Sequence, residues 1–278
     1  MLKQVSSFTP GLYVVATPIG NLGDLSPRAR EVLAAATVVA AEDTRTSAKL
    51  VKLAGSTGRM VSLTEHNVMD RAPGLLAAAG ESVVALVSDA GTPVVADPGA
   101  RLVEAAHAAG IAVVAIPGPS ALTAAVSVSG FPGSDVHFLG FLPRGQAERG
   151  ARLKQAAAGA EVLVFFESPT RLAATLRELV TLLGDPEAVV CRELTKLHEE
   201  AVRGRASELA GRFRETRGEC TVVVRIATET PGAIDTAALR EYLAAMKRAG
   251  AQRSGAAAEA ARRFAIERRA AYELWHEV

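Results

Sequence analysis

Short apolar runs that alternate with segments of helical character constrain the fold of this chain most strongly. Residues 12–16, 37–41 and 83–87 are nearly continuous in apolar side chains and have the length of strands, which is typical of strands buried on both faces of a parallel sheet. A helix is predicted from Ser26-Pro27 to about residue 35, because serine is a favoured N-cap and proline a favoured first helical residue. The alternation predicts an α/β fold, a parallel sheet with helices on both faces.

The pattern restarts after residues 130–133 (GFPG), which are the best candidate for a connection between domains. We therefore expect an N-terminal parallel-sheet α/β domain at 10–130 and a second α/β domain at 131–228. In the second domain strands are predicted at 138–141, 162–166, 188–192 and 220–226, and helices at 146–157, 169–183 and 207–213. A helical C-terminal region at 229–278 is predicted to hold two or three helices, beginning near residues 236, 254 and 267.

Composition limits the classes of function. The formal net charge of the 278 residues is +1, so charge alone does not predict nucleic-acid binding. Cys191 and Cys220 lie in apolar runs and predict buried thiols in a reducing compartment, not a disulfide or zinc site. No secretory leader is apparent, and prolines, a glycine and serines interrupt the uncharged stretch at residues 111–131. These features predict a cytoplasmic protein that makes no contact with a membrane.

Several common catalytic motifs are absent. The sequence contains no GxGxxG after a strand, no phosphate-binding P-loop, no GxSxG and no HExxH, so we predict no metal site. What remains is a set of small, proline-containing loops at strand ends, at 17–24, 41–45, 88–93 and 117–121. Ligands of α/β sheets bind outside the carboxyl ends of strands, and Gly91 allows backbone to approach a ligand closely. The loops predict a shallow, mostly neutral cleft for a ligand with apolar, sugar and amino-acid parts.

Six motifs in one order carry a resemblance to a known family. They are ATPIGNLGD at 16–24, AAEDTR at 40–45, LVSDAGTP at 86–93, PGPS at 117–120, FFESPTR at 165–171 and RELTK at 192–196. Together they resemble the ribosomal RNA small subunit methyltransferase I family, a branch of the tetrapyrrole methylase superfamily. The likeness covers about residues 11–226 and is looser in the tail.

The resemblance implies S-adenosylmethionine as the methyl donor. It implies as acceptor the ribose 2′-hydroxyl of a cytidine in the decoding region of 16S rRNA, position 1402 in the usual RNA numbering, so that 16S rRNA or the small ribosomal subunit is the partner. It also implies two α/β domains of the tetrapyrrole methylase type, with the cofactor in the cleft between them, and a homodimer.

The resemblance assigns candidate cofactor contacts to three of the loops, at 17–24, 88–93 and 117–121, and to the end of the strand at 162–166. These candidates are Pro18, Gly20, Ser88, Asp89, Ala90, Gly91, Thr92, Pro93, Ser120, Ala121 and Glu167.

A base is expected near the acceptor, because a ribose hydroxyl is a poor nucleophile until its proton is accepted. The candidate catalytic residues are Glu42, Asp43, Arg45 and Glu167, with Asp24 as a further carboxylate. Two interpretations of the Glu42–Arg45 motif stay open, because Asp43 could simply cap the next helix and pair with Arg45. Glu167 could likewise serve only to order the loop before Pro169.

Two other functions fit parts of the sequence. A tetrapyrrole C-methyltransferase has the same fold but usually carries different loops at 42–45 and 166–168. An RNA-binding assembly factor could keep the cofactor fold without turnover, although the intact loop at 88–93 argues against it. The chain from residue 240 onward has eight Lys and Arg against five Asp and Glu. Within it, the basic tail at residues 253–269 is either a contact for RNA phosphates or a solvated helix face that packs the dimer.

Overall fold

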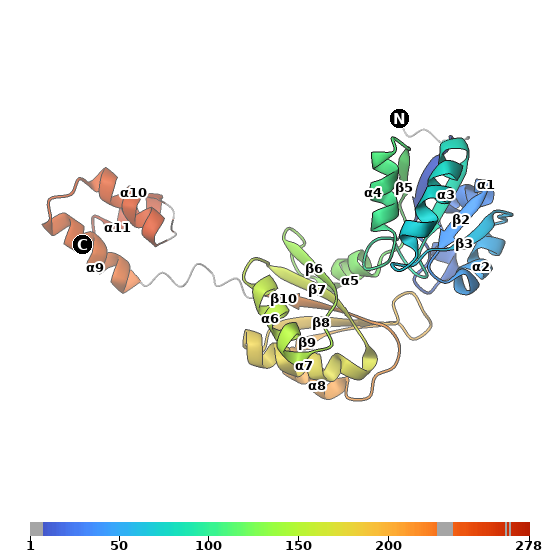
Figure 1. Cartoon of the computed structure of the whole chain (residues 1–278). Helices are drawn as coiled ribbons and strands as arrows, with labels where there is room; N and C mark the ends of the chain where they lie inside the picture. The colour runs from blue at the N-terminus through green and yellow to red at the C-terminus, as the bar shows by residue number, and fades with distance from the viewer. Residues whose placement is uncertain (1–7, 227–235, 265, 267) are drawn as a thin grey trace. The chain divides into compact units, whose positions relative to one another are not determined.

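The computed structural model describes residues 8–226, 236–264, 266 and 268–278. The chain divides into two compact units, one ending at Ile226 and the other beginning at Ala227. Within the described residues the larger unit holds two five-stranded sheets and the smaller unit holds three helices (Figure 1). The two-sheet α/β architecture predicted from the sequence is confirmed.

The first sheet is parallel throughout, in the order β3-β2-β4-β1-β5. Because β1 pairs with β4, the loops that follow these two strands meet at one edge of the sheet, where Thr17 and Gly91 form an isolated bridge. This edge is where the sequence predicts ligand contacts. The strands are β1 (Gly11–Val15), β2 (Val38–Ala41), β3 (Arg59–Ser62), β4 (Val83–Val87) and β5 (Val113–Ile116).

Helices cover both faces of the first sheet. Leu33 and Val51 bring α1 and α2 onto one face, and Leu75 and Leu102 bring α3 and α4 onto the other. Ser26 caps the first helix as predicted, since its hydroxyl accepts a hydrogen bond of 3.1 Å from the Ala29 N–H. The elements are η1 (Leu22–Asp24), α1 (Pro27–Ala35), α2 (Thr44–Leu53), α3 (Val68–Glu81) and α4 (Ala100–Ala108).

The second sheet is mixed, in the order β6-β7-β10-β8-β9. Only β6 and β7 are parallel; the other three neighbouring pairs are antiparallel. The sequence predicts an α/β domain here without a strand direction; the sheet is mixed because β8 and β9 form an antiparallel pair and β10 inserts between β7 and β8. The strands are β6 (Val136–Phe141), β7 (Val162–Glu167), β8 (Glu187–Arg192), β9 (Glu200–Arg205) and β10 (Cys220–Arg225).

One face of the second sheet is covered by α6 (Gln146–Ala157), α7 (Pro169–Leu183) and α8 (Ala206–Arg212), and the other by α5 (Ala121–Ser129). Helix α5 precedes residue 130, yet it packs on β7, β9 and β10. Its fully buried Ala125 lies in one cluster with Val164 and Val223. The last helix before residue 130 thus belongs, by its packing, to the second sheet.

The sequence pattern does not predict strands β3 and β9, which both lie at sheet edges. Strand β3 buries only Val61, and β9 alternates half-buried and exposed residues with three charged side chains. Edge strands commonly carry charge and little apolar side-chain surface, so neither segment has the apolar run by which the inner strands are predicted.

The smaller unit packs α9 (Thr236–Arg248), α10 (Arg253–Arg263) and α11 (Arg268–Leu274) around Leu239, Leu243, Ala257 and Trp275. The segment 229–235 and the helix start predicted near residue 267 lie outside the described residues. In the part of the chain that the structure describes, no helix is long and apolar enough to span a bilayer.

Candidate functional site

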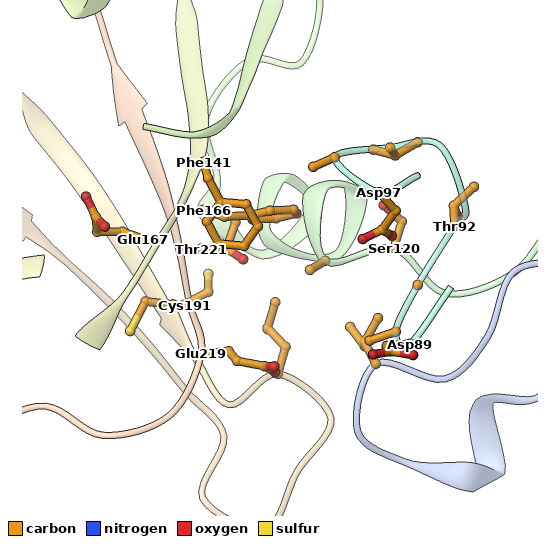
Figure 2. A pocket seen from close by; sticks show the side chains of 18 of the residues that line it. Asp89, Thr92, Asp97, Ser120, Phe141, Phe166, Glu167, Cys191, Glu219 and Thr221 are labelled. Carbon is orange, nitrogen blue, oxygen red and sulfur yellow. The ribbon is translucent and has the colours of Figure 1, made fainter. Parts of the chain in front are cut away.

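A cavity of about 410 Å³ lies between the loops at the carboxyl edge of the first sheet and one end of the second sheet, within the range of about 300–1,000 Å³ typical of small-molecule sites. In Figure 2, Thr92, Asp97 and Ser120 lie on one side, and Phe141, Phe166 and Thr221 on the other. The first half contributes residues 19, 89–92, 95–97, 120 and 121, and the second half 141, 166–169, 191, 194 and 219–221.

Backbone hydrogen bonds hold the loop after β4 against the loop after β1. Thr17 and Gly91 exchange two, from the Thr17 N–H at 2.8 Å and from the Gly91 N–H at 3.1 Å. Gly91 adopts a φ of +86°, a left-handed conformation that side chains disfavour. Thr92 donates its hydroxyl proton to the Pro119 carbonyl at 3.2 Å. Three strand-end loops are thereby joined into one wall of the cavity.

The same loop continues through strained backbone into the cavity. Val94 and Ala96 have φ values of +75° and +66°, which are uncommon for residues with a Cβ and concentrate at functional sites. Gly99 follows at a φ of +126°, where a Cβ would lie 2.9 Å from Cδ2 of Leu86. This path brings the half-buried Asp97 to the cavity wall.

Asp97 lies among other carboxylates. Burial, with smaller contributions from the charges of Glu42 and Asp89, raises its pKa to about 6, against a hydrogen bond from Ser88 that lowers it. The pKa of Glu42 is also raised, first by burial and then by Asp89 and Asp43. A carboxyl with a pKa near 6 is ionised at neutral pH and is a stronger proton acceptor than an ordinary aspartate.

Asp43 and Arg45 form a local structure beside the cavity. Asp43 caps α2 by accepting a hydrogen bond of 2.8 Å from the Arg45 N–H, and its carboxylate lies 3.1 Å from the Arg45 guanidinium. The hydrogen bond from Arg45 lowers the pKa of Asp43. The Asp43 N–H donates to Oδ1 of Asp89 at 3.3 Å. Asp43 thus caps α2 and pairs with Arg45, as one of the two interpretations of this motif predicts. Its backbone N–H also helps to hold Asp89 in position.

Glu167 closes β7 with its carboxylate turned away from the centre of the cavity (Figure 2). Its side chain is fully buried, 2.6 Å from the Arg171 guanidinium. Oε2 accepts a hydrogen bond of 2.7 Å from Thr175, and Oε1 one of 2.8 Å from the Ser168 N–H. These contacts order the turn from β7 into α7.

The two halves also meet outside the cavity wall, at Gly20. A Cβ there would lie 2.5 Å from Cγ of Lys196 and 2.9 Å from Oγ1 of Thr195. Lys196 is held by Glu193 at 3.0 Å and Glu219 at 2.9 Å, and its hydrogen bond lowers the pKa of Glu193. Only a glycine allows this approach of the first loop to the segment after β8.

The apolar lining includes Ile19, Leu194 and Cys191, all buried. Burial raises the pKa of the Cys191 thiol to about 11, so it is not a thiolate nucleophile at neutral pH. Within the described residues, no three His, Cys, Asp or Glu side chains gather in a way that could hold a metal ion.

Comparison with known proteins decides the family. The sequence model of the tetrapyrrole (corrin/porphyrin) methylases matches residues 11–210. A ribosomal RNA small subunit methyltransferase I of Thermotoga maritima is 46% identical over 216 residues, covering 77% of this chain and 97% of the relative. The protein of that name from Micromonospora olivasterospora is 44% identical, covering 87% and 78%. The chain belongs to the ribosomal RNA small subunit methyltransferase I family. This membership confirms the resemblance that the six sequence motifs indicate.

Solved structures support the methyltransferase fold. A uroporphyrin-III C-methyltransferase from Thermus thermophilus, complexed with S-adenosyl homocysteine, has a TM-score of 0.54 at 22% identity, covering 77% of this chain and 97% of that one. A diphthine synthase has a TM-score of 0.60 at 19% identity, covering 77% and 89%. At these identities the likeness concerns the fold alone.

The cavity of this methyltransferase family member includes seven of the predicted cofactor contacts: Asp89, Ala90, Gly91, Thr92, Ser120, Ala121 and Glu167. Pro18, Gly20, Ser88 and Pro93 belong to the same loops without lining it, and Glu42, Asp43 and Arg45 lie outside the lining. Sequence reasoning missed Asp97, Phe141, Phe166, Glu219 and Thr221. The signal for Asp97 was present, since the DPG sequence at 97–99 follows the loop at 88–93.

Proposed function

We propose that this chain methylates the ribose 2′-hydroxyl of cytidine 1402, in the decoding region of 16S rRNA, within the small ribosomal subunit. The observation that carries the proposal is the Asp97 carboxyl on the wall of the cavity between the two halves, in a chain of the methyltransferase I family. A methyl donor and a hydroxyl acceptor need such a site, enclosed enough to align two reactants and supplied with a proton acceptor.

The residues present fit S-adenosylmethionine. Ile19, Ala121 and Leu194 offer apolar surface to an adenosine, and Gly91 leaves room for close backbone contact. The carboxylate of Asp89 suits the positive charges of the sulfonium and the amino group. When bound, the cofactor supplies a methyl group on a positively charged sulfur.

The chain itself supplies position and a base. We assign to Asp97 the acceptance of the 2′-hydroxyl proton, because its carboxylate lines the cavity and its pKa of about 6 keeps it ionised at neutral pH. A carboxylate oxygen of Asp97 would accept the 2′-hydroxyl proton, and the bound cofactor would supply the methyl group and leave as S-adenosyl homocysteine once its methyl–sulfur bond is broken. Because Glu42 and Asp89 share the neighbourhood, their negative charges strengthen Asp97 as a proton acceptor.

Other predicted residues take supporting roles in this proposal. Glu167 fixes the turn that forms the second wall. Glu42 acts on Asp97 through its charge, and Asp43 through its N–H to Asp89. Arg45, whose side chain is 91% exposed, is available to an RNA phosphate in addition to its contact with Asp43. The exposed Arg262, Arg263, Arg268 and Arg269 of the smaller unit are further candidates for phosphate contact.

A labelling experiment tests the function. The protein is incubated with methyl-labelled S-adenosylmethionine and small ribosomal subunits that lack the modification, and in parallel with a porphyrinoid precursor. The expected result is label at the ribose of cytidine 1402 alone. Label only in the porphyrinoid would favour a tetrapyrrole C-methyltransferase. Cofactor binding without label in either substrate would favour an assembly factor without turnover.

The proposal also covers the oligomeric state of the protein and the compartment in which it acts. We expect a homodimer in the cytoplasm, where ribosomal subunits are assembled. Light scattering coupled to gel filtration measures the mass of the particle, and a monomer across the micromolar range would contradict the dimer.

A further inference from the structure

Phe141 is unusual among the residues that line the cavity. Its side chain is 64% exposed, whereas Ile19 and Leu194 are only 9% and 8% exposed. Large apolar side chains that stay this exposed beside a cavity are candidates for ligand contact. The buried residues form the inner apolar wall, and Phe141 forms an outer wall that is accessible from solvent.

The backbone directs Phe141 to this place. The pairing of β6 with β7 shifts its register between Phe138 and Phe141, as at a bulge, which commonly redirects a side chain next to a site. Gly140 takes a φ of +63° there. A Cβ at Gly140 would lie 3.7 Å from the Cβ of Ala96. Phe141 therefore follows a point of contact with the strained loop that carries Asp97.

Neighbouring rings support the side chain. The ring centroid of Phe141 lies 5.4 Å from that of Phe166 at 62°, and Phe166 lies 5.0 Å from Phe138 at 69°. These are edge-to-face arrangements, which aromatic pairs favour. Because most of the Phe141 ring remains exposed, it can still accept a flat partner.

The segment after Phe141 is held by two arginines. Arg171 donates hydrogen bonds of 3.3 Å to the carbonyls of Leu142 and Pro143, and Arg149 donates one of 3.0 Å to the carbonyl of Arg144. Arg149 is itself buried and paired with Glu178. A surface fixed in this way loses little conformational freedom when a ligand binds. Arg144, three residues after Phe141, is exposed and adds a positive charge to this segment.

We infer that Phe141 is the surface on which the base of the acceptor nucleotide stacks. The inference rests on the proposed function. A base displaced from RNA stacks on aromatic side chains, and the base of the acceptor is joined to the ribose whose hydroxyl meets Asp97. The acceptor base fits this position better than the adenine of the cofactor, because the buried inner wall already suits adenosine and Phe141 faces the solvent from which RNA arrives.

The test compares Phe141→Leu, which keeps an apolar side chain, with Phe141→Trp, which keeps a stacking surface. The KM for unmodified small subunits, kcat, and the Kd of S-adenosyl homocysteine are measured for each variant. Phe141→Leu is expected to raise KM by about 10- to 100-fold, since one stacked base contributes a factor of this order, and to leave the cofactor Kd within about threefold of its original value. Phe141→Trp is expected to restore KM. Met69→Leu, at an apolar side chain of 67% exposure on α3 outside the cavity, is the matched control.

Three results would overturn the inference. An unchanged KM in Phe141→Leu would show that the acceptor base does not stack on Phe141. A raised KM that Phe141→Trp does not restore would show that the loss of ring stacking does not cause the rise. A parallel loss of cofactor affinity would assign Phe141 to the adenosine of the cofactor instead. If the unaltered chain does not methylate the ribose at all, the proposed function fails and the inference fails with it. Failure of the inference alone differs from this result, because the unaltered chain then stays active and only the behaviour of the Phe141 variants contradicts the expectation.

Discussion

The hydroxyl of Thr175 donates a hydrogen bond of 2.7 Å to Oε2 of Glu167, whose side chain is fully buried. With Arg171 and the Ser168 N–H as further partners, this carboxylate has its main acceptor positions filled. A carboxylate so bound is well suited to hold a wall of the cavity in place, and it is turned away from the centre of the cavity (Figure 2).

Glu167→Gln is expected to lower the free energy of unfolding by about 3 kcal/mol, because it leaves the half-buried Arg171 without its charge partner. Urea denaturation followed by circular dichroism measures the change. The exposed Glu148 on α6 provides the control, since Glu148→Gln removes a charge without a buried partner. A variant that keeps its stability but loses methyl transfer would instead give Glu167 a direct catalytic part.

Methyl transfer should depend on pH through Asp97. Since burial and neighbouring charges raise the pKa of this carboxyl to about 6, the rate is expected to rise between pH 5 and pH 7 and then to level. Asp97→Asn should reduce kcat by about 10²- to 10⁴-fold and remove this dependence. Single-turnover rates measure both effects. The exposed Asp24 on η1 is the control, and an equal loss in Asp24→Asn would contradict the assignment.

The same raised pKa predicts an effect on stability. In the unfolded chain an aspartate titrates near 3.9, so ionisation of Asp97 lowers the stability of the fold as pH rises toward and through about 6. Asp97→Asn removes this loss. Its melting temperature should exceed that of the unaltered protein by a few degrees at pH 8 and by less at pH 4.5, because 1 kcal/mol shifts the melting temperature by about 2–4 °C in a chain of this size. A difference that does not vary with pH would contradict the raised pKa.

Asp89→Ala is expected to weaken binding of S-adenosyl homocysteine by about 10- to 100-fold. The change removes both an anion at the cavity wall and the acceptor of the Asp43 N–H, and a hydrogen bond to a charged group contributes about 1.5–3 kcal/mol. Calorimetry measures the affinity. The exposed Asp70 on α3 is the control, and equal affinities in both variants would refute the role of Asp89.

Gly20→Ala should separate the loop after β1 from the segment after β8, because its Cβ would overlap Cγ of Lys196. We expect a rise of about tenfold or more in the Kd of the cofactor, since a displacement at a site costs affinity steeply. The control is Gly74→Ala in α3, where a Cβ meets nothing within 4 Å and should stabilise the helix by up to about 1 kcal/mol. Unchanged cofactor affinity in Gly20→Ala would show that the two loops move freely.

The inner strands and most helices could be predicted because each carries a local signal. The helices at Gln146–Ala157 and Pro169–Leu183 have the predicted bounds, since their periodic apolar residues and turn residues mark both ends. Strand direction in the second half has no such signal. Whether β10 lies parallel or antiparallel to β7 is set by pairing between segments that are distant in sequence, such as Cys220 with Glu167.

In the site, too, some residues could be predicted from local sequence signals and others could not. The loop at 88–93 could be assigned to the cavity from its small and polar residues, and the structure brings four of its residues to the wall. The DPG sequence marks a turn at Asp97, but the sequence does not show that Asp97 and Phe141 line the cavity, because a positive φ at Ala96 and a register shift before Phe141 bring them there. Neither feature leaves a mark in composition or spacing.

Helix α5 gives the chain a property that its order of elements conceals. Because the helix lies before residue 130 and covers a face of the sheet that follows it, a protein cut at that point would separate the second sheet from one of its own layers. Each fragment would expose the apolar surface that Ala125 and Val223 now share. During synthesis, the packing of α5 can therefore be completed only after β10 has left the ribosome.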